Sequence, residues 1–287
     1  KSGIWQGRRC VKSSTGCLYT EAVVSSSGIT EARSFMSVIL EVEHLTKIFT
    51  RRGSEPLKAV DDVSFQLRSG ETLGIVGESG SGKSTLAKML TRLTDVSSGT
   101  LKVEEKDITS LKRRELREMY GTIQMVFQDP VSSFDPRKTL GYGIGESLRN
   151  RGMKKTEVDE RVKQALEQCG LSSEFADRYP HEVSGGQCQR AAIARALIAE
   201  PKILICDEAT SALDVTIQKH RMELLQELKE NRGLSFIFIC HNLALVQEFC
   251  DRVLVLYDGK NVEEGTTDKV ILHPQNEYTK KLIESAS

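Results

Sequence analysis

The chain has 287 residues, a length that fits one large domain or two smaller ones and can bury a sizeable core. Lys+Arg and Asp+Glu number 40 each, so the formal net charge is zero, which argues against a uniform basic field that would hold a nucleic-acid backbone. A hydrophobic content of 39% with 28% charged residues is typical of a globular domain. No apolar run approaches the roughly 18 residues of a membrane-spanning helix.

The seven cysteines are spread along the chain, and no two of them have C-x-x-C spacing. Ordinary zinc-site spacing is therefore absent. Cys206 and Cys240 end apolar runs, which predicts buried, reduced thiols rather than disulfides.

The first 35 residues differ from the rest. They are rich in Ser, Thr and Gly and have no sustained hydrophobic period. We interpret 1–35 as a poorly ordered extension, or a segment left by cloning, and expect the folded domain to cover 36–287.

From residue 37 onward, short apolar runs alternate with helical patterns, which predicts an α/β fold with a largely parallel sheet. The runs are bounded by breakers and resemble buried strands. The predicted strands are Thr72–Val76, Ile123–Phe127, Ile203–Cys206, Phe236–Cys240 and Val253–Tyr257. The predicted helices between them include Ser84–Leu93, Gln187–Ala199 and Thr216–Arg232.

One interval, about 129–182, breaks this alternation. It opens with two Asp-Pro pairs, carries the amphipathic stretch Thr156–Cys169 and contains no strand-like run, so we predict a helical insertion. The segments Val38–Leu67 and Leu254–Gly265 are typical of hairpin-rich β structure.

A glycine-rich loop follows the first buried strand. Residues 77–84 read Gly-Glu-Ser-Gly-Ser-Gly-Lys-Ser and satisfy G-x-x-x-x-G-K-[ST], between a predicted strand and a predicted helix. The glycines let successive backbone N–H groups face phosphate oxygens, and the helix adds its positive end. Lys83 would reach the β- and γ-phosphates, and Ser84 would ligate Mg²⁺. The predicted nucleotide-binding residues here are Gly77, Glu78, Ser79, Gly80, Ser81, Gly82, Lys83, Ser84 and Thr85.

Two adjacent acids end a later apolar strand. Asp207 would hold Mg²⁺, and Glu208 would polarise the attacking water. A strand that ends in solvated acids is common. Together with the glycine-rich loop upstream, however, the acid pair becomes good evidence for a nucleotide site, and it favours nucleotide hydrolysis over nucleotide binding alone.

A second candidate anion site precedes the helix Gln187–Ala199. Ser184, Gly185 and Gly186 would place two backbone N–H groups and a hydroxyl at the helix start, beside Gln187. One chain around one nucleotide needs no second phosphate site, whereas a dimer that sandwiches two nucleotides does. An ordinary N-capped helix explains this stretch alone equally well.

Together, Ser184-Gly-Gly-Gln187, the loop 77–84 and Asp207-Glu208 resemble the nucleotide-binding domain of ABC-type ATPases, and the resemblance covers residues 38–270. It implies a P-loop NTPase (RecA-like) core with a mainly parallel sheet, an antiparallel β subdomain and a helical insertion subdomain. Further positions match in order. Gln128 resembles the glutamine that senses the γ-phosphate, Asp214 belongs to a loop that contacts the opposite subunit, His241 resembles the switch histidine, and Phe49 lies where the family stacks an aromatic ring on adenine.

The resemblance implies roles for these residues. The catalytic set is Glu208, His241, Gln128 and Lys83. Phe49, Gln128, Ser184–Gln187 and Asp214 join the loop in binding ATP, and Ser84, Gln128 and Asp207 hold Mg²⁺. Val183 and Asn242 stand where Leu and Asp are usual, and the missing Asp charge puts the orientation of the histidine loop in doubt.

Subfamily features point to an importer. The segment Phe127–Thr139 and the tail Pro274–Leu282 resemble peptide and nickel importer ATPases. This implies separate permease subunits, a second ABC ATPase in a homo- or heterodimer, a solute-binding protein acting indirectly, no nucleic acid, and a peripheral location on the cytoplasmic face of the membrane. An ABC exporter ATPase, a non-transport ABC ATPase and a non-catalytic binding module remain as alternatives.

Overall fold

The computed structural model describes residues 8–13, 16–24, 30–35, 37–50, 53, 55–112, 114–207 and 215–286, with only the backbone described over 8–35, over 215–221 and at 286. Within the first 35 residues, three strands form an antiparallel sheet, which the sequence pattern did not predict: β1 (Arg8–Ser13), β2 (Gly16–Val24) and β3 (Thr30–Phe35).

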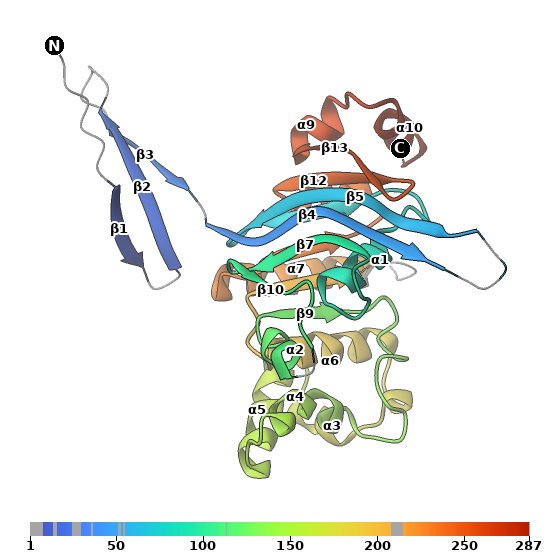
Figure 1. Cartoon of the computed structure of the whole chain (residues 1–287). Coiled ribbons are helices and arrows are strands. Elements are labelled where there is room, and N and C mark those ends of the chain that lie inside the picture. Colours follow the sequence, from blue (N-terminus) through green and yellow to red (C-terminus); the bar gives the residue numbers. More distant parts are fainter. Residues whose placement is uncertain are drawn as a thin grey trace.

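The central sheet of the domain has six strands in the order β13-β12-β6-β11-β10-β9 (Figure 1). Its parallel strands are β6 (Thr72–Val76), β9 (Ile123–Val126), β10 (Ile203–Asp207), β11 (Ser235–Ile239) and β12 (Arg252–Tyr257). Only β13 (Lys260–Thr266) runs antiparallel, at one edge. The predicted α/β fold with a mainly parallel sheet is confirmed.

The strands of this sheet are apolar throughout because both faces are covered. Ile203 and Ile205 of β10 belong to one buried cluster, and the alternate residues Leu204 and Cys206 belong to the other. Side chains alternate across a strand, so an unbroken apolar run satisfies two cores at once.

One face of the central sheet packs on helix α1 and on a second, antiparallel sheet. That sheet has the order β5-β4-β7-β8, with β4 (Val38–Phe49), β5 (Leu57–Arg68), β7 (Ser98–Val103) and β8 (Lys106–Asp107). Helix α1 (Lys83–Leu90) contributes Leu86, Met89 and Leu90, all fully buried, to the shared core. This core fixes the position of the segment that enters α1.

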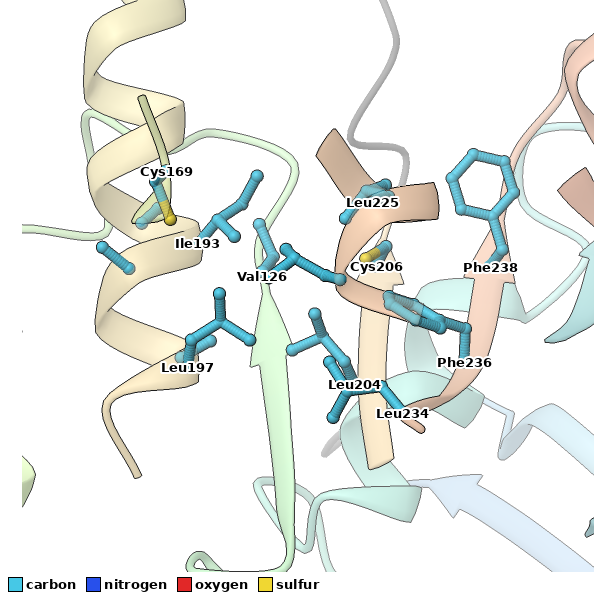
Figure 2. Close-up of a cluster of buried hydrophobic side chains, with 14 of the residues drawn as sticks. Val126, Cys169, Ile193, Leu197, Leu204, Cys206, Leu225, Leu234, Phe236 and Phe238 are labelled. Atoms are coloured by element: carbon cyan, nitrogen blue, oxygen red, sulfur yellow. The ribbon is translucent and has the colours of Figure 1, made fainter. Parts of the chain in front are cut away.

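The other face is covered by helices. Figure 2 shows Leu197 and Ile193 of α6 beside Val126 of β9, and Leu225 of α7 above Cys206. The covering helices include α6 (Gly185–Leu197), α7 (Val215–Arg232), α8 (Leu243–Phe249) and α9 (Thr267–Leu272), with α10 (Glu277–Ala286) packed against the same cluster.

The regular elements described between β9 and α6 are all helices, and Figure 1 shows this part as a lobe at one end of the molecule. Its elements are α3 (Leu140–Ile144), α4 (Glu146–Asn150), α5 (Lys155–Gln168) and two short 3₁₀ helices, Ser173–Asp177 and Pro180–Glu182. The short α2 (Arg114–Met119) precedes β9. The described helices include none that is both long and apolar enough to cross a bilayer.

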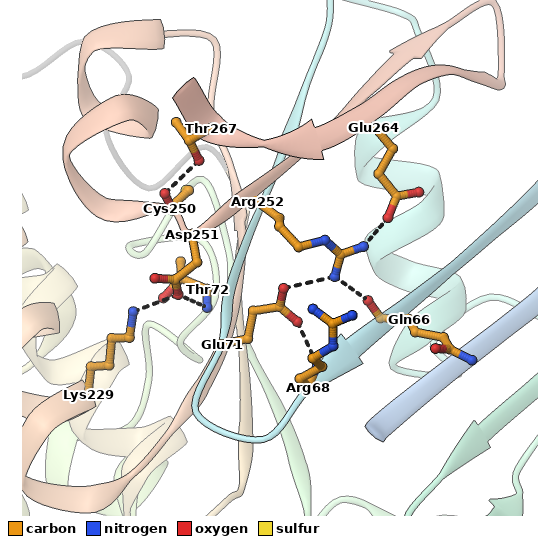
Figure 3. Close-up of polar contacts among 10 residues, drawn as sticks. All are labelled: Gln66, Arg68, Glu71, Thr72, Lys229, Cys250, Asp251, Arg252, Glu264 and Thr267. Atoms are coloured by element: carbon orange, nitrogen blue, oxygen red, sulfur yellow. Dashed lines mark hydrogen bonds and ion pairs between the residues drawn. The ribbon is translucent and has the colours of Figure 1, made fainter. Parts of the chain in front are cut away.

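A group of ion pairs holds the start of β6. Arg252 donates to Glu71 at 2.8 Å, to Glu264, and to the Gln66 carbonyl at 3.1 Å (Figure 3). The Glu71 side chain is 5% exposed, so its charge is compensated inside the protein. Beside it, Asp251 accepts from the Thr72 amide at 2.7 Å. These contacts join β5, β6, β12 and β13 at the amino end of the strand that leads into the loop.

Candidate active site

The parallel register brings the predicted site residues to one edge of the central sheet. Ile239 of β11 pairs with Asp207 on one side and Ile75 on the other, and Cys206 pairs with Val126. The carboxyl ends of β6, β9, β10 and β11 therefore coincide. Gly77, Gln128, Asp207 and His241 follow or end these strands, so residues far apart in the chain share one crevice, the usual ligand position in an open parallel sheet.

Two glycines let the loop 77–82 pass close to neighbouring backbone. Gly77 has φ +150° and Gly82 has φ +101°. A Cβ atom added at Gly77 would overlap the carbonyl oxygen of Leu256, and one added at Gly82 would overlap that of Ala59. Only glycine combines this backbone conformation with this close approach.

Lys83 lies inside the loop that precedes it. Its ammonium donates to the carbonyl oxygens of Gly77 at 2.8 Å and Glu78 at 2.7 Å, and lies 3.4 Å from the Ser81 hydroxyl. The residue is 4% exposed. These contacts hold a positive charge at the centre of the loop, where it can meet a phosphate.

A pocket of about 410 Å³ opens beside the loop. Eight of the predicted residues line it: Phe49, Ser79, Gly80, Gly82, Lys83, Ser84, Thr85 and Gln128. The volume is in the usual range for a small-molecule site. The structure thus brings the predicted aromatic residue, the loop and the glutamine together.

Phe49 is suitably placed to stack on a flat ring. It ends β4, its side chain is exposed, and the Lys47 ammonium lies 5.0 Å from its ring centre. A half-open aromatic face at the rim of a pocket binds a planar base through dispersion.

Ser84 and Asp207 form a pair of oxygen donors. The Ser84 hydroxyl donates to Asp207 Oδ1 at 3.1 Å, and Asp207 is 4% exposed. Hydroxyl and carboxylate oxygens are the ligands that Mg²⁺ prefers in sites shared with phosphates. The residues present therefore fit a magnesium ion between the loop and β10.

Three other predicted residues are placed less completely. Glu208 and Asp214 lie outside the described residues. His241 is exposed, two residues after β11. The next residue, Asn242, caps α8 by accepting from the Ala244 amide at 3.0 Å, so it supports the helix start without a carboxylate.

Ser184 and Gln187 form a capping box at the start of α6. Ser184 Oγ accepts from the Gln187 amide at 3.3 Å, and Gln187 Oε1 accepts from the Ser184 amide at 2.9 Å. Ser184 and Gly185 are exposed. Within one chain these residues satisfy the helix end, and their surface is open to a second molecule.

Sequence reasoning missed several residues that line the pocket. Leu57, Lys58 and Ala59 come from β5, and Asp258 and Gly259 form the turn between β12 and β13. Asp-Gly between two strands is a strong hairpin signal. That signal could have located the turn, but not its position beside the loop.

A strand, a glycine-rich loop with a buried lysine, a helix and a serine–aspartate pair define a P-loop nucleotide hydrolase. The sequence model of the ABC transporter family matches residues 60–211. The chain belongs to the ABC transporter family and is an ATP-binding, ABC-type ATPase.

Curated relatives share much of the chain. The oligopeptide transport ATP-binding protein OppF of Salmonella typhimurium is 51% identical over 229 residues, covering 79% of this chain and 69% of the relative. OppF of Escherichia coli is 46% identical over 267 residues, covering 90% and 79%. OppF of Bacillus subtilis is 44% identical over 249 residues, covering 85% and 81%.

Solved structures agree with the fold. A dimeric ATP-binding cassette in a post-hydrolysis state with ADP and Pi superposes with a TM-score of 0.73 at 30% identity, over 80% of this chain and 99% of that one. cbiO1 of Clostridium perfringens, part of an ABC transporter complex, gives 0.71 at 30% identity over 82% and 91%. The predicted antiparallel β and helical subdomains are confirmed with the core.

Proposed function

We propose that this chain is the ATP-hydrolysing subunit of an oligopeptide importer. The observation that carries the proposal is the identity of 51% to a protein named for oligopeptide transport, in a chain whose pocket gathers the residues that ATP requires. The predicted subfamily also includes nickel importers, and the uptake experiment below distinguishes peptide import from nickel import.

The chemistry assigned to the site is hydrolysis of the terminal phosphate of ATP. The loop amides and Lys83 would bind phosphate oxygens, and Phe49 would stack on the base. Ser84, Asp207 and Gln128 would hold Mg²⁺, which would neutralise negative charge on the phosphates. Glu208 would accept the proton of the attacking water, and His241 would contact the terminal phosphate.

Two copies, or this chain and a related ATPase, would close around two nucleotides. The exposed Ser184 and Gly185 would contact the phosphate bound by the partner. ATP would favour the closed pair, and loss of the terminal phosphate would favour the open one, which is a switch between two states.

The permease would dock in a groove between the core and the helical lobe. The groove has a volume of about 350 Å³ and includes Leu93, Tyr120 and Phe127, with Arg117 and Arg151 at exposed positions. Leu93 is 51% exposed, and Phe127 immediately precedes Gln128. Contact here would link a membrane subunit to the nucleotide pocket, and would hold the ATPase at the cytoplasmic face of the membrane.

The test is uptake by cells that lack this gene. We expect the wild-type gene to restore uptake of a radiolabelled tripeptide, and the Glu208→Gln gene to restore none. Purification of the tagged protein in mild detergent with ATP should recover two permeases, a second ATPase and a peptide-binding protein, and Leu93→Glu should lose the permeases while keeping ATP binding. Restored nickel uptake without peptide uptake would overturn the peptide assignment.

A further inference from the structure

We propose that Tyr278, in the C-terminal helix α10, is a positioning residue for the phosphate-binding loop. Its hydroxyl oxygen accepts a hydrogen bond from the backbone amide of Glu78 at 2.9 Å, across 200 residues of sequence. Glu78 is the second residue of the loop, so this contact joins the end of the chain to the nucleotide site. The inference rests on the ATP-binding role of the loop.

The Tyr278 ring is held from two sides. It packs on Tyr257 of β12, with 4.1 Å between ring centres. Its own amide donates to Asn276 Oδ1 at 2.8 Å. Because the ring and the backbone are both fixed, the hydroxyl points at Glu78 with little rotational freedom left to lose.

The turn before α10 is fixed to β13. The two oxygens of Glu263 accept from the amides of Gln275 at 2.8 Å and Asn276 at 3.1 Å. The partly buried carboxylate therefore anchors the segment that carries Tyr278. This anchoring gives the hydroxyl a defined position relative to the central sheet, and not only relative to its own helix.

The contact with Tyr278 complements that with Lys83. The Glu78 carbonyl accepts from the Lys83 ammonium at 2.7 Å, while the Glu78 amide donates to Tyr278. When Lys83 turns to a phosphate, its bond to the Glu78 carbonyl is released, and the bond to Tyr278 remains. Tyr278 thus keeps the first part of the loop in its phosphate-binding shape while the lysine changes partner.

The end of the loop near Ser81 is also held, by the hairpin that joins β12 and β13. The Gly259 amide donates to the Ser81 carbonyl at 3.1 Å, and Gly77 passes against Leu256. The β12–β13 hairpin and α10 therefore hold both ends of the loop. A loop ordered before ATP arrives avoids the entropy cost of ordering on binding, so Tyr278 acts on nucleotide affinity rather than on the chemical step.

The test compares two matched variants. Tyr278→Phe keeps the stacked ring and removes the hydroxyl, whereas Tyr257→Phe removes the hydroxyl of the neighbouring ring. Dissociation constants for ADP, measured by calorimetry, report binding without turnover. We expect Tyr278→Phe to raise the dissociation constant for ADP by about 5- to 10-fold, because one hydrogen bond is lost. Tyr257→Phe should change this constant by less than about twofold.

Two further readouts separate positioning from general damage. Tyr278→Phe should raise KM for ATP with kcat within about twofold of wild type, and hydrogen exchange of the Glu78 amide should quicken while the thermal midpoint falls by no more than about 4 °C. Equal ADP affinity and equal Glu78 exchange would overturn the proposal, as would a lowered thermal midpoint with kcat and affinity lost together. A wild-type protein that bound no ADP would instead refute the nucleotide site itself.

Discussion

The Ser84 hydroxyl donates to Asp207 Oδ1 at 3.1 Å, across 123 residues of sequence. Ser84 belongs to the first turn of α1, and Asp207 is the last residue of β10. The bond holds the two oxygens at a separation at which both could ligate one metal ion. We therefore expect the fold itself to hold these two proposed Mg²⁺ ligands in place.

Asp207→Asn is expected to lower Mg²⁺-dependent ATP hydrolysis by about 100-fold or more, because the amide keeps the contact with Ser84 but removes the negative charge. Nucleotide affinity measured in EDTA should change little. Steady-state hydrolysis and calorimetry with and without Mg²⁺ check this. Asp268→Asn, at an exposed position in α9, is the matched control. Unchanged hydrolysis in Asp207→Asn would show that the ion is held elsewhere.

Ser184→Arg is expected to abolish ATP-driven dimerisation, because a large cation would fill the surface offered to the second molecule. The measurement is size-exclusion chromatography with ATP in a Glu208→Gln background, where the dimer should accumulate. Ser172→Arg is the matched control, since Ser172 is also an exposed cap, accepting from the Glu174 amide. Both variants lose about 1 kcal/mol of capping energy, so only the dimer distinguishes them. A dimer retained by Ser184→Arg would contradict the two-sided site.

Because the Cys169 thiol is buried, we expect the protein to lose stability at alkaline pH. Burial raises the pKa of Cys169 to about 12, although Arg232 and Arg190 act in the opposite direction. The unfolded thiol loses its proton near pH 8.5 while the folded one keeps it, so the free energy of unfolding falls as the pH rises above that value. At pH 10 this one thiol lowers the free energy of unfolding by about 2 kcal/mol relative to its value at neutral pH.

The check is denaturant unfolding of wild type and Cys169→Ala in a reducing buffer from pH 7 to pH 10. The variant should lose less stability across this range than the wild type, whatever its stability at pH 7. Parallel pH profiles would show that the thiol ionises equally in both states. Four further cysteines, Cys188, Cys206, Cys240 and Cys250, are also buried, so the comparison isolates one of several similar groups.

Arg252→Met is expected to destabilise the protein by about 3 kcal/mol, because it leaves the carboxylate of Glu71 buried without its cation. Glu71→Gln keeps an acceptor for the Arg68 amide, which Glu71 now binds at 2.7 Å. The double variant should lose less than the sum of the two single losses, by about 1–3 kcal/mol. Urea unfolding of the four proteins measures this coupling. Strictly additive losses would mean that the pair contributes no coupling energy.

The sequence predicted the elements that have strong local signals. Thr72–Val76 is followed by Gly77, and β10 and β11 are unbroken apolar runs, so the predicted bounds of these strands are within one residue of the observed ones. Gly82 marks the start of α1, but the helix ends at Leu90, three residues before the predicted Leu93. β7 was not predicted, because Ser98–Val103 alternates too briefly to stand out from its polar neighbours. Pairing with β4 stabilises it instead.

The site residues likewise fall into those that a local motif predicts and those that it does not. The phosphate loop and Asp207 carry local motifs, and Phe49 and Gln128 were reachable only through the family resemblance. Tyr278 has no motif relating it to Glu78, since the contact depends on how α10 and β12 pack. Such contacts arise from tertiary structure and leave no periodic mark on the chain.

The position of β6 has a consequence for synthesis. Its two neighbours, β11 and β12, begin at Ser235 and Arg252, more than half the chain later. While a ribosome is still making the middle of the protein, β6 has neither neighbour, and the loop lacks the backbone of Leu256 and Gly259 that shapes it. We therefore expect the loop of a nascent chain to acquire its phosphate-binding shape only after β12 and the turn that follows it have been synthesised.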